Sequence, residues 1–229
     1  MQEQQSTTQR FATPAPISVH CDIPAGRIRF IAAARTDTTV EVLPADASRS
    51  RDVKAAGQTR VAYGDGVLRI EVPEAGNRVL GTGGGIEVTV QLPTGSHLLA
   101  NSADAELRGV GRLGDVTLEA ARATVKLDET AEAHLTLQAG DITLGRLGGS
   151  ARISTRKGDI RITEAVRGTV TLRTESGDIT VGAARGVSAS LDAGTAYGRI
   201  HNALHSTDGG AALEIHATTS YGDITARSQ

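Results

Sequence analysis

The sequence predicts an all-β fold: a single-stranded β-helix or β-solenoid with coils of about 18 residues and an irregular β cap at its N-terminal side. Three observations support this prediction. Apolar and polar residues alternate in many short segments, a Gly-Asp motif recurs at a near-constant interval, and aromatic residues make up only 2% of the chain. Alternation indicates strands with one buried face, and recurrence indicates a repeat architecture.

The repeated motif is a Gly-Asp pair followed by a β-branched residue. It occurs as AGDITL (139–144), KGDIRI (157–162), SGDITV (176–181) and YGDITA (221–226). A fifth copy, YGRIHN (197–202), has Arg199 in the Asp position. The central apolar residues of these motifs, together with two weaker copies before them, are Leu107, Val125, Ile142, Ile160, Ile179, Ile200 and Ile224. We expect these residues to stack into one aliphatic ladder.

A second strand-like segment lies between successive motifs. The segments are 115–120, 133–138, 151–156, 169–174, 189–194 and 212–217. Two strands per unit predict coils stacked at the β-sheet spacing of roughly 4.8 Å, with Ile, Leu and Val inside. An antiparallel sandwich is the alternative, because its turns also recur every 8 to 12 residues or so. It does not require the longer repeat, so the solenoid is favoured.

The chain divides into a disordered polar N-terminus (1–13) and one β-solenoid domain (14–229). Within that domain, we expect irregular opening strands and a cap over 14–100 and regular repeats over 101–229. The opening part also contains AGRIRF (25–30), which resembles the later motif with Arg in place of Asp.

Three local patterns stand out in the opening part. The segment 63–67, Tyr-Gly-Asp-Gly-Val, predicts a hairpin, because glycine permits a positive φ in the turn. A short helix is predicted over 47–58, with Ser48 or Ser50 as its N-cap and Gly57 at its end. The glycine-rich segment 78–88 is predicted to be a mobile loop.

Composition excludes several classes of partner. The net charge of -2 provides no electrostatic attraction for nucleic acid or an anionic membrane. No apolar run approaches the roughly 18 residues that span a bilayer. The N-terminal segment MQEQQSTTQR lacks the layout of a signal peptide, and the single Cys21 has no partner for an internal disulfide. We therefore expect a soluble, cytoplasmic protein if Met1 is the native start.

The repeated carboxylates are the first candidate site: Asp115, Asp141, Asp159, Asp178 and Asp223. Stacked carboxylates bind Ca²⁺ in β-rolls, but those motifs are denser in glycine and recur about every nine residues. The favoured interpretation is that each Gly occupies a turn and each Asp accepts backbone N–H groups there. Arg199 in one copy also argues against an obligatory metal ladder.

Other candidate chemistry is sparse. His201 and His205 are four residues apart, and His216 on the neighbouring strand offers the best chance of a cluster. There is no HExxH, GxSxG or Cys/His pairing, and the stretch 81–85 lacks the Gly-Lys-Ser/Thr ending of a phosphate loop. Cys21 fits a buried small apolar residue. We expect no catalytic residue, no cofactor and no metal, and therefore no enzyme.

The sequence resembles one known family. The ladder of GDI motifs, the opening FATPAPISVHCDIPAGRIRF (11–30) and the closing TSYGDITARS (219–228) are similar to the DUF4097 family of bacterial β-strand-repeat proteins, some of which are called adhesin-like. The resemblance extends from Phe11 to Arg227. It implies a β-helical or solenoid fold and no established reaction, cofactor or catalytic residue. The adhesin name fits poorly with a sequence that lacks an export signal.

These observations favour a noncatalytic β-repeat scaffold or protein-interaction module. Its partner is either an unknown protein or a second copy, bound through the strand edges of the terminal coils. The chain ends on the strand motif YGDITARSQ, so we expect that coil to be the open one. The alternative is a carbohydrate-binding or surface adhesin-like protein, which is weaker because the chain has no Trp and only three Tyr.

Overall fold

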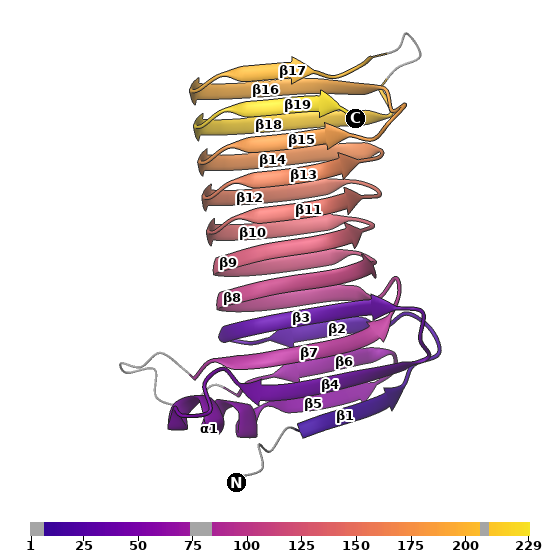
Figure 1. The fold of residues 1–229 in the computed structure, drawn as a ribbon, viewed down its shortest axis with the longest axis vertical. Coiled ribbons are helices and arrows are strands. Elements are labelled where there is room, and N and C mark those ends of the chain that lie inside the picture. The colour runs from indigo at the N-terminus through magenta and orange to yellow at the C-terminus, as the bar shows by residue number, and fades with distance from the viewer. Residues whose placement is uncertain (1–6, 74–83, 207–210) are drawn as a thin grey trace.

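The computed structural model describes residues 7–73, 84–206 and 211–229. Within them, nineteen strands and one helix form a tall stack of β coils (Figure 1). The predicted all-β solenoid is confirmed. No helix within these ranges is long and apolar enough to cross a membrane.

The upper part of the stack consists of parallel coils, each formed by two strands or by one long bent strand. In chain order the strands are β8 (His97–Leu113), β9 (Val116–Thr130), β10 (Ala133–Ala139), β11 (Ile142–Leu147), β12 (Ala151–Lys157), β13 (Ile160–Ala165), β14 (Gly168–Ser176), β15 (Ile179–Ala183), β16 (Ala189–Tyr197), β17 (Ile200–Ala203), β18 (Leu213–Tyr221) and β19 (Ile224–Ser228). The β10, β12, β14, β18 and β16 strands form one wall. The β11, β13, β15, β19 and β17 strands form the other.

The seven central apolar residues of the motifs, which we call the marker residues, do form one ladder. Leu107 pairs with Val125, and the ladder continues through the isoleucines of β11, β13 and β15. Six of the seven side chains are buried, and Ile200 is the exposed one. Alternation within each strand places one apolar residue at this inward position in every coil, so stacking aligns residues of the same kind.

The order of the last two coils in space differs from their order along the chain. Ile179 pairs with Ile224, and Ile224 pairs in turn with Ile200. The coil β18–β19 is therefore inserted between β14–β15 and β16–β17, as Figure 1 shows near the top of the stack. The expectation that YGDITARSQ forms the open coil is wrong, because β16–β17 ends the stack.

The start of the chain is inserted in the same manner. Strands β2 (Ser18–Asp22) and β3 (Ala25–Ala33) pair with β8 on one side. On the other side they pair with β6 (Val67–Glu71) and β7 (Ile86–Pro93). These opening strands are parallel and continue the ladder, since Ile28 pairs with Leu107.

Antiparallel strands close the N-terminal side. Strand β4 (Asp37–Pro44) pairs antiparallel with β7, and β1 (Thr7–Ala12) pairs antiparallel with β4. On the other wall, β5 (Arg60–Gly64) pairs antiparallel with β6. The predicted disorder of residues 1–13 is wrong for 7–12, because strand pairing holds them, while residues 1–6 lie outside the described residues.

The local predictions in this part have mixed outcomes. The hairpin is confirmed: Gly64 pairs with Val67, and Asp65 and Gly66 have φ of 51° and 75°. The helix is confirmed as α1 (Ser50–Gln58), but neither predicted serine caps it. Arg49 is the N-cap without a side-chain bond, and the Ser48 hydroxyl instead donates to Asp46 Oδ1 at 2.6 Å. The helix also continues one residue past Gly57.

The predicted loop over 78–88 is only partly described. Residues 78–83 lie outside the described residues, and Ile86 begins strand β7 rather than belonging to a loop. Just before it, the Gly85 N–H donates to the buried carboxylate of Asp52 in α1 at 2.9 Å. This bond ties the helix to the start of β7.

Candidate functional site

The Gly-Asp corners were the most prominent sequence motif. Gly158, Gly177 and Gly222 have φ between 141° and 150°. A Cβ on any of them would lie 2.0–2.1 Å from the carbonyl oxygen of the corner glycine in the coil below. Glycine is therefore required at this corner by both backbone conformation and close stacking.

The aspartates of these corners form a hydrogen-bond ladder between coils. The Asp159 N–H donates to Asp141 Oδ1 at 2.9 Å, and the Asp178 N–H donates to Asp159 Oδ1 at 2.8 Å. The Asp223 N–H likewise donates to Asp178 Oδ1 at 2.7 Å. Each carboxylate thus receives the N–H of the next coil, which confirms the predicted structural role. Asp115 is not part of this ladder; its N–H donates to His97 Nδ1 at 3.0 Å.

Arg199 occupies the last position of the ladder. Its N–H donates to Asp223 Oδ1 at 2.8 Å, and its guanidinium donates to Asp223 Oδ2 at 2.7 Å. These hydrogen bonds, the guanidinium's first, hold the pKa of Asp223 below its usual range. Because β16–β17 is the last coil, no further coil needs a carboxylate at this position. The departure from the motif therefore marks the end of the stack.

A second ladder at the same corner was missed in the sequence. Thr174 and Thr219 are buried, and their hydroxyls donate to the carbonyl oxygens of Gly158 and Gly177, each at 3.1 Å. Thr195 does the same to Gly222 at 3.0 Å. Each threonine stands three residues before the corner glycine of its own coil. That constant spacing is the pattern that reveals them.

The structure does not bring the histidines together. His201 lies on β17 and His216 on β18, which belong to opposite walls of the solenoid, and both are exposed. His216 Nδ1 is 3.4 Å from Asp192 Oδ2. Within the described ranges, no group of three or more His, Cys, Asp or Glu side chains is placed to hold a metal ion.

Cys21 is buried in the core, as predicted. Burial, and secondly the charge of Asp22, raises the pKa of its thiol. A thiol that stays protonated and cannot be reached from solvent is a poor nucleophile. Cys21 therefore contributes packing.

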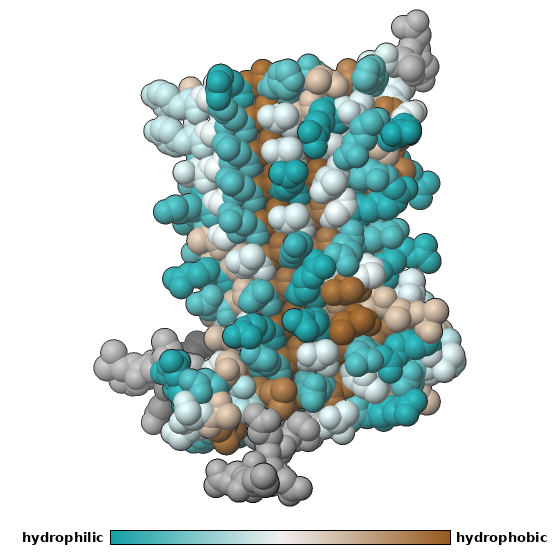
Figure 2. Space-filling view, in the orientation of Figure 1, coloured by the Kyte–Doolittle hydropathy of each residue, from teal (hydrophilic) through white to brown (hydrophobic). Residues whose placement is uncertain are grey.

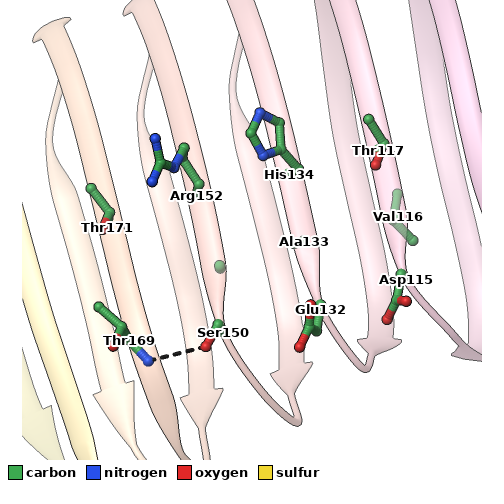
Figure 3. A pocket seen from close by; sticks show the side chains of 11 residues that line it. Asp115, Val116, Thr117, Glu132, Ala133, His134, Ser150, Arg152, Thr169 and Thr171 are labelled. Atoms are coloured by element: carbon green, nitrogen blue, oxygen red, sulfur yellow. Dashed lines mark hydrogen bonds between the residues drawn. The ribbon is translucent and has the colours of Figure 1, made fainter.

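A groove of about 310 Å³ runs across β9, β10, β12 and β14 (Figure 3). One row of its lining side chains, in ladder register, is Thr117, His134, Arg152 and Thr171. A second row at the strand entrances is Asp115, Glu132, Ser150 and Thr169. The groove is polar, and its charged side chains are exposed.

The groove has no catalytic geometry. Ser150 Oγ accepts the Thr169 N–H at 3.2 Å, so a backbone group, and not a base, faces the hydroxyl (Figure 3). His134 and Arg152 stand side by side on neighbouring strands and point outward. A nucleophile needs a base within hydrogen-bond reach, and the groove does not supply such a pair. The groove is part of the outer surface. The face drawn in Figure 2 is mostly hydrophilic, with apolar atoms visible between the polar side chains along the stack.

The most unusual surface is the end of the stack, which we call the open end and define as the exposed side of β16 and β17. Among the residues that the structure describes, strand β16 pairs only with β18, and β17 pairs only with β19. The Ile200 side chain is 46% exposed, whereas Ile224 in the coil below is 0% exposed. Leu191 on β16 is half-buried, although Ile215 below it is buried. The apolar interior is therefore uncovered at this end.

The opposite end is closed by aromatic side chains. Phe11 from β1 and Tyr63 from β5 pack against the core with ring centroids 5.5 Å apart. These rings bridge the two walls where the stack begins. Among the described residues the two ends thus differ in their side chains and strand direction: one has the Phe11–Tyr63 contact and antiparallel strands, and the other has parallel strands alone. At both ends the outermost strands pair on one edge only.

Two more aromatic side chains lie at the corner beside the open end. Tyr197 and Tyr221 stack with their ring centroids 4.9 Å apart and their planes 4° from parallel. Both are exposed. They provide a flat aromatic face on an otherwise polar surface.

Comparison with known proteins decides the family. The family model described as Toastrack DUF4097 matches residues 82–227, which is more than half of the chain. The chain belongs to the DUF4097 family. The sequence resemblance is therefore confirmed, and the DUF4097 match covers all of the regular coils. No curated protein matches the sequence.

Solved structures are similar to this DUF4097 chain at low sequence identity, and one of them reaches a TM-score of 0.50. A candidate adhesin from Parabacteroides distasonis is 12% identical, with a TM-score of 0.50 over 97% of this chain and 98% of the other. A candidate lipid-binding protein from the same species is 11% identical, with a TM-score of 0.48 over 97% of both chains. A candidate cell adhesion protein from Clostridium sporogenes is 9% identical, with a TM-score of 0.44 over 98% and 100%. At these identities the similarity concerns the fold alone.

Proposed function

We propose that this DUF4097 protein is a noncatalytic scaffold that binds a protein partner through its open end. The observation that carries the proposal is the exposure of Ile200, which is 46% against 0% for Ile224 at the same ladder position. Uncovered apolar side chains at the end of a β stack mark either an interaction site or an aggregation hazard.

The backbone of the open end supports the same proposal. Within the described part of the chain, the nine residues of β16 and the four residues of β17 each have one edge without a strand partner. Such edges bind a further strand by main-chain hydrogen bonds, while the side chains beside it select the partner. The rest of the stack supplies rigidity, because every coil is bonded to its neighbours along two walls. The structurally similar protein from P. distasonis is itself named as a candidate adhesin, which agrees with a binding role.

The test uses a pair of matched variants. Ile200→Lys places a charge at the edge of the open end, a change that blocks strand addition. Val53→Lys is the control, because Val53 on α1 is 47% exposed and lies at the other end of the stack. Each protein is immobilised, exposed to an extract of the native cell, and the bound proteins are identified by mass spectrometry.

The expected result is a partner retained by the wild type and by Val53→Lys but lost with Ile200→Lys. That partner is then purified, and its affinity is measured by calorimetry. A drop of at least about tenfold, or roughly 1.4 kcal/mol, is expected for Ile200→Lys. Equal affinity for both variants would place the binding surface elsewhere and contradict the proposal.

A carbohydrate ligand is the second candidate, and the stacked pair Tyr197 and Tyr221 favours it. An exposed aromatic face is a large, rigid contact surface with an apolar body and a polar tip. The test is a glycan array with the wild type and with Tyr197→Ala. Binding that disappears in the variant supports this candidate, and an array without any bound glycan rejects it.

A further inference from the structure

We infer that the partner of the open end is the open end of a second copy, so that two chains join tail to tail about a two-fold axis. This inference rests on the proposed function, because it uses the same surface and names the partner. The first reason is the asymmetry of the stack: the Phe11 and Tyr63 rings close the N-terminal side, while the interior at Ile200 is uncovered. A head-to-tail contact would place the exposed Ile200 against the Phe11 and Tyr63 rings, which already pack on the core of their own chain.

The second reason is the end of the aspartate ladder. A coil stacked in the same direction on β16–β17 would present its corner N–H to the side chain at position 199, as Asp223 presents its own to Asp178 at 2.7 Å. Arg199 has only donors, so it cannot accept that bond. Its guanidinium is also held by Asp223. The ladder therefore stops at Arg199. A second copy stacked in the same direction would lack the hydrogen bond from a backbone N–H to an aspartate Oδ1 that joins the corners from Asp141 upward.

The third reason is that a two-fold axis avoids this conflict. When two identical ends meet about an axis perpendicular to the stack, each end strand runs antiparallel to the strand that it meets. Antiparallel pairing needs no corner carboxylate, and it satisfies free edges on both walls at once. The half-buried Leu191 and Leu204 and the exposed Ile200 would then face apolar residues of the other copy.

The charges at the open end permit such a contact. Arg199 is paired with Asp223, and Asp192 faces His216. The Arg199 charge is thus matched within each copy, so two identical ends do not bring an unpaired guanidinium against its own copy. A surface with unbalanced charge would repel its own copy.

The experiment measures molar mass by size-exclusion chromatography with light scattering, over a range of protein concentration. The wild type and Val53→Lys are expected to reach twice the chain mass of 23.7 kDa. Ile200→Lys is expected to stay at the single-chain mass. Leu191→Lys tests the other end strand and is also expected to stay single. Circular dichroism melts of all four proteins show that each variant is folded before its mass is interpreted.

Three outcomes would overturn the inference: a wild type that stays single at the highest concentration, a dimer that survives in both folded end variants, or a mass that keeps rising as in a head-to-tail filament. The inference and the proposed function fail separately. If the wild type is single but still captures a partner that Ile200→Lys loses, the two-fold dimer is rejected and the open end remains a binding surface. If the dimer forms and no other partner is captured through the end, self-association alone stands.

Discussion

At four corners of the upper coils, one glycine lets the chain turn, and the aspartate after it accepts the backbone N–H of the neighbouring turn. Both roles are predictable from the residue types, since glycine and aspartate are residues that turns favour. The buried threonines are harder to predict, because a Thr in a strand is ordinary until the stacked register shows what its hydroxyl meets. Thr174 is such a case: its hydroxyl bonds a glycine of a different coil at 3.1 Å.

The glycine requirement predicts a large cost for Gly177→Ala. The added Cβ would lie 2.0 Å from the Gly158 carbonyl oxygen, at a φ of +150°. We expect a loss of about 1–3 kcal/mol in the free energy of unfolding, measured by urea denaturation. Gly64→Ala is the control, since an added Cβ there meets no atom within 4 Å. Equal stability of the two variants would show that the corner is not constrained in this way.

The lowered pKa of Asp223 predicts a pH-dependent effect of Arg199→Gln. The folded pKa lies below the unfolded value of about 3.9, so the stabilisation is present above that value and is lost as the pH falls through the folded pKa. We expect the variant to melt at a lower temperature than the wild type at pH 7. This difference in melting temperature should close as the pH falls through the lowered pKa of Asp223. Arg199→Lys keeps the charge, so its melting temperature should differ less from that of the wild type. A difference that is the same at every pH contradicts the assignment.

Among the elements, the marker isoleucines occupy equivalent ladder positions in different coils, and their burial separates the middle of the stack from its end. Ile160 in β13 is 0% exposed and Ile200 in β17 is 46% exposed. Both pair with an isoleucine of the next coil. The loss of folding free energy on replacing each isoleucine by alanine should therefore depend on its burial and not on its residue type.

We expect Ile160→Ala to lower the free energy of unfolding by about 2–5 kcal/mol, because it leaves a cavity in the core. Ile200→Ala should lower it by less than about 1 kcal/mol, because solvent already reaches the side chain. Thermal or urea unfolding of both variants checks the comparison. Similar losses would mean that Ile200 is covered in the folded protein.

The same ladder shows what sequence can and cannot predict. The inward positions from Leu107 to Ile179 follow from alternation and spacing, so the sequence identified them correctly. The exchange of β18–β19 with β16–β17 could not be predicted from similarity, because both coils carry the same motif and either fits beside Ile179. Arg199 was noted only as a departure from the pattern. Ile224 pairs with both Ile179 and Ile200, and only this pairing shows that the coil of Arg199 is the last in the stack.

For the whole molecule, one coil from the start of the chain and one from its end lie in the interior of the stack. The coil β2–β3 lies between β8 and the pair β6–β7, and β18–β19 lies between two other coils. Insertion gives β18 and β19 strand neighbours on both sides and leaves β16 and β17 at the open end, whereas β1, the first described strand, pairs with β4 alone. The candidate site therefore depends on the order of coils in space, and it could not be located from the sequence.

The most direct test of this order is hydrogen–deuterium exchange by mass spectrometry on the Ile200→Lys variant, in which the open end should be free of a partner. Amides of 213–228 have strand neighbours on both sides, whereas amides of 189–203 have a neighbour on one side only. Slower exchange is therefore expected in 213–228 than in 189–203, because frayed edges open at a lower free-energy cost. Faster exchange in 213–228 would show that the chain terminus is the last coil and would contradict the account.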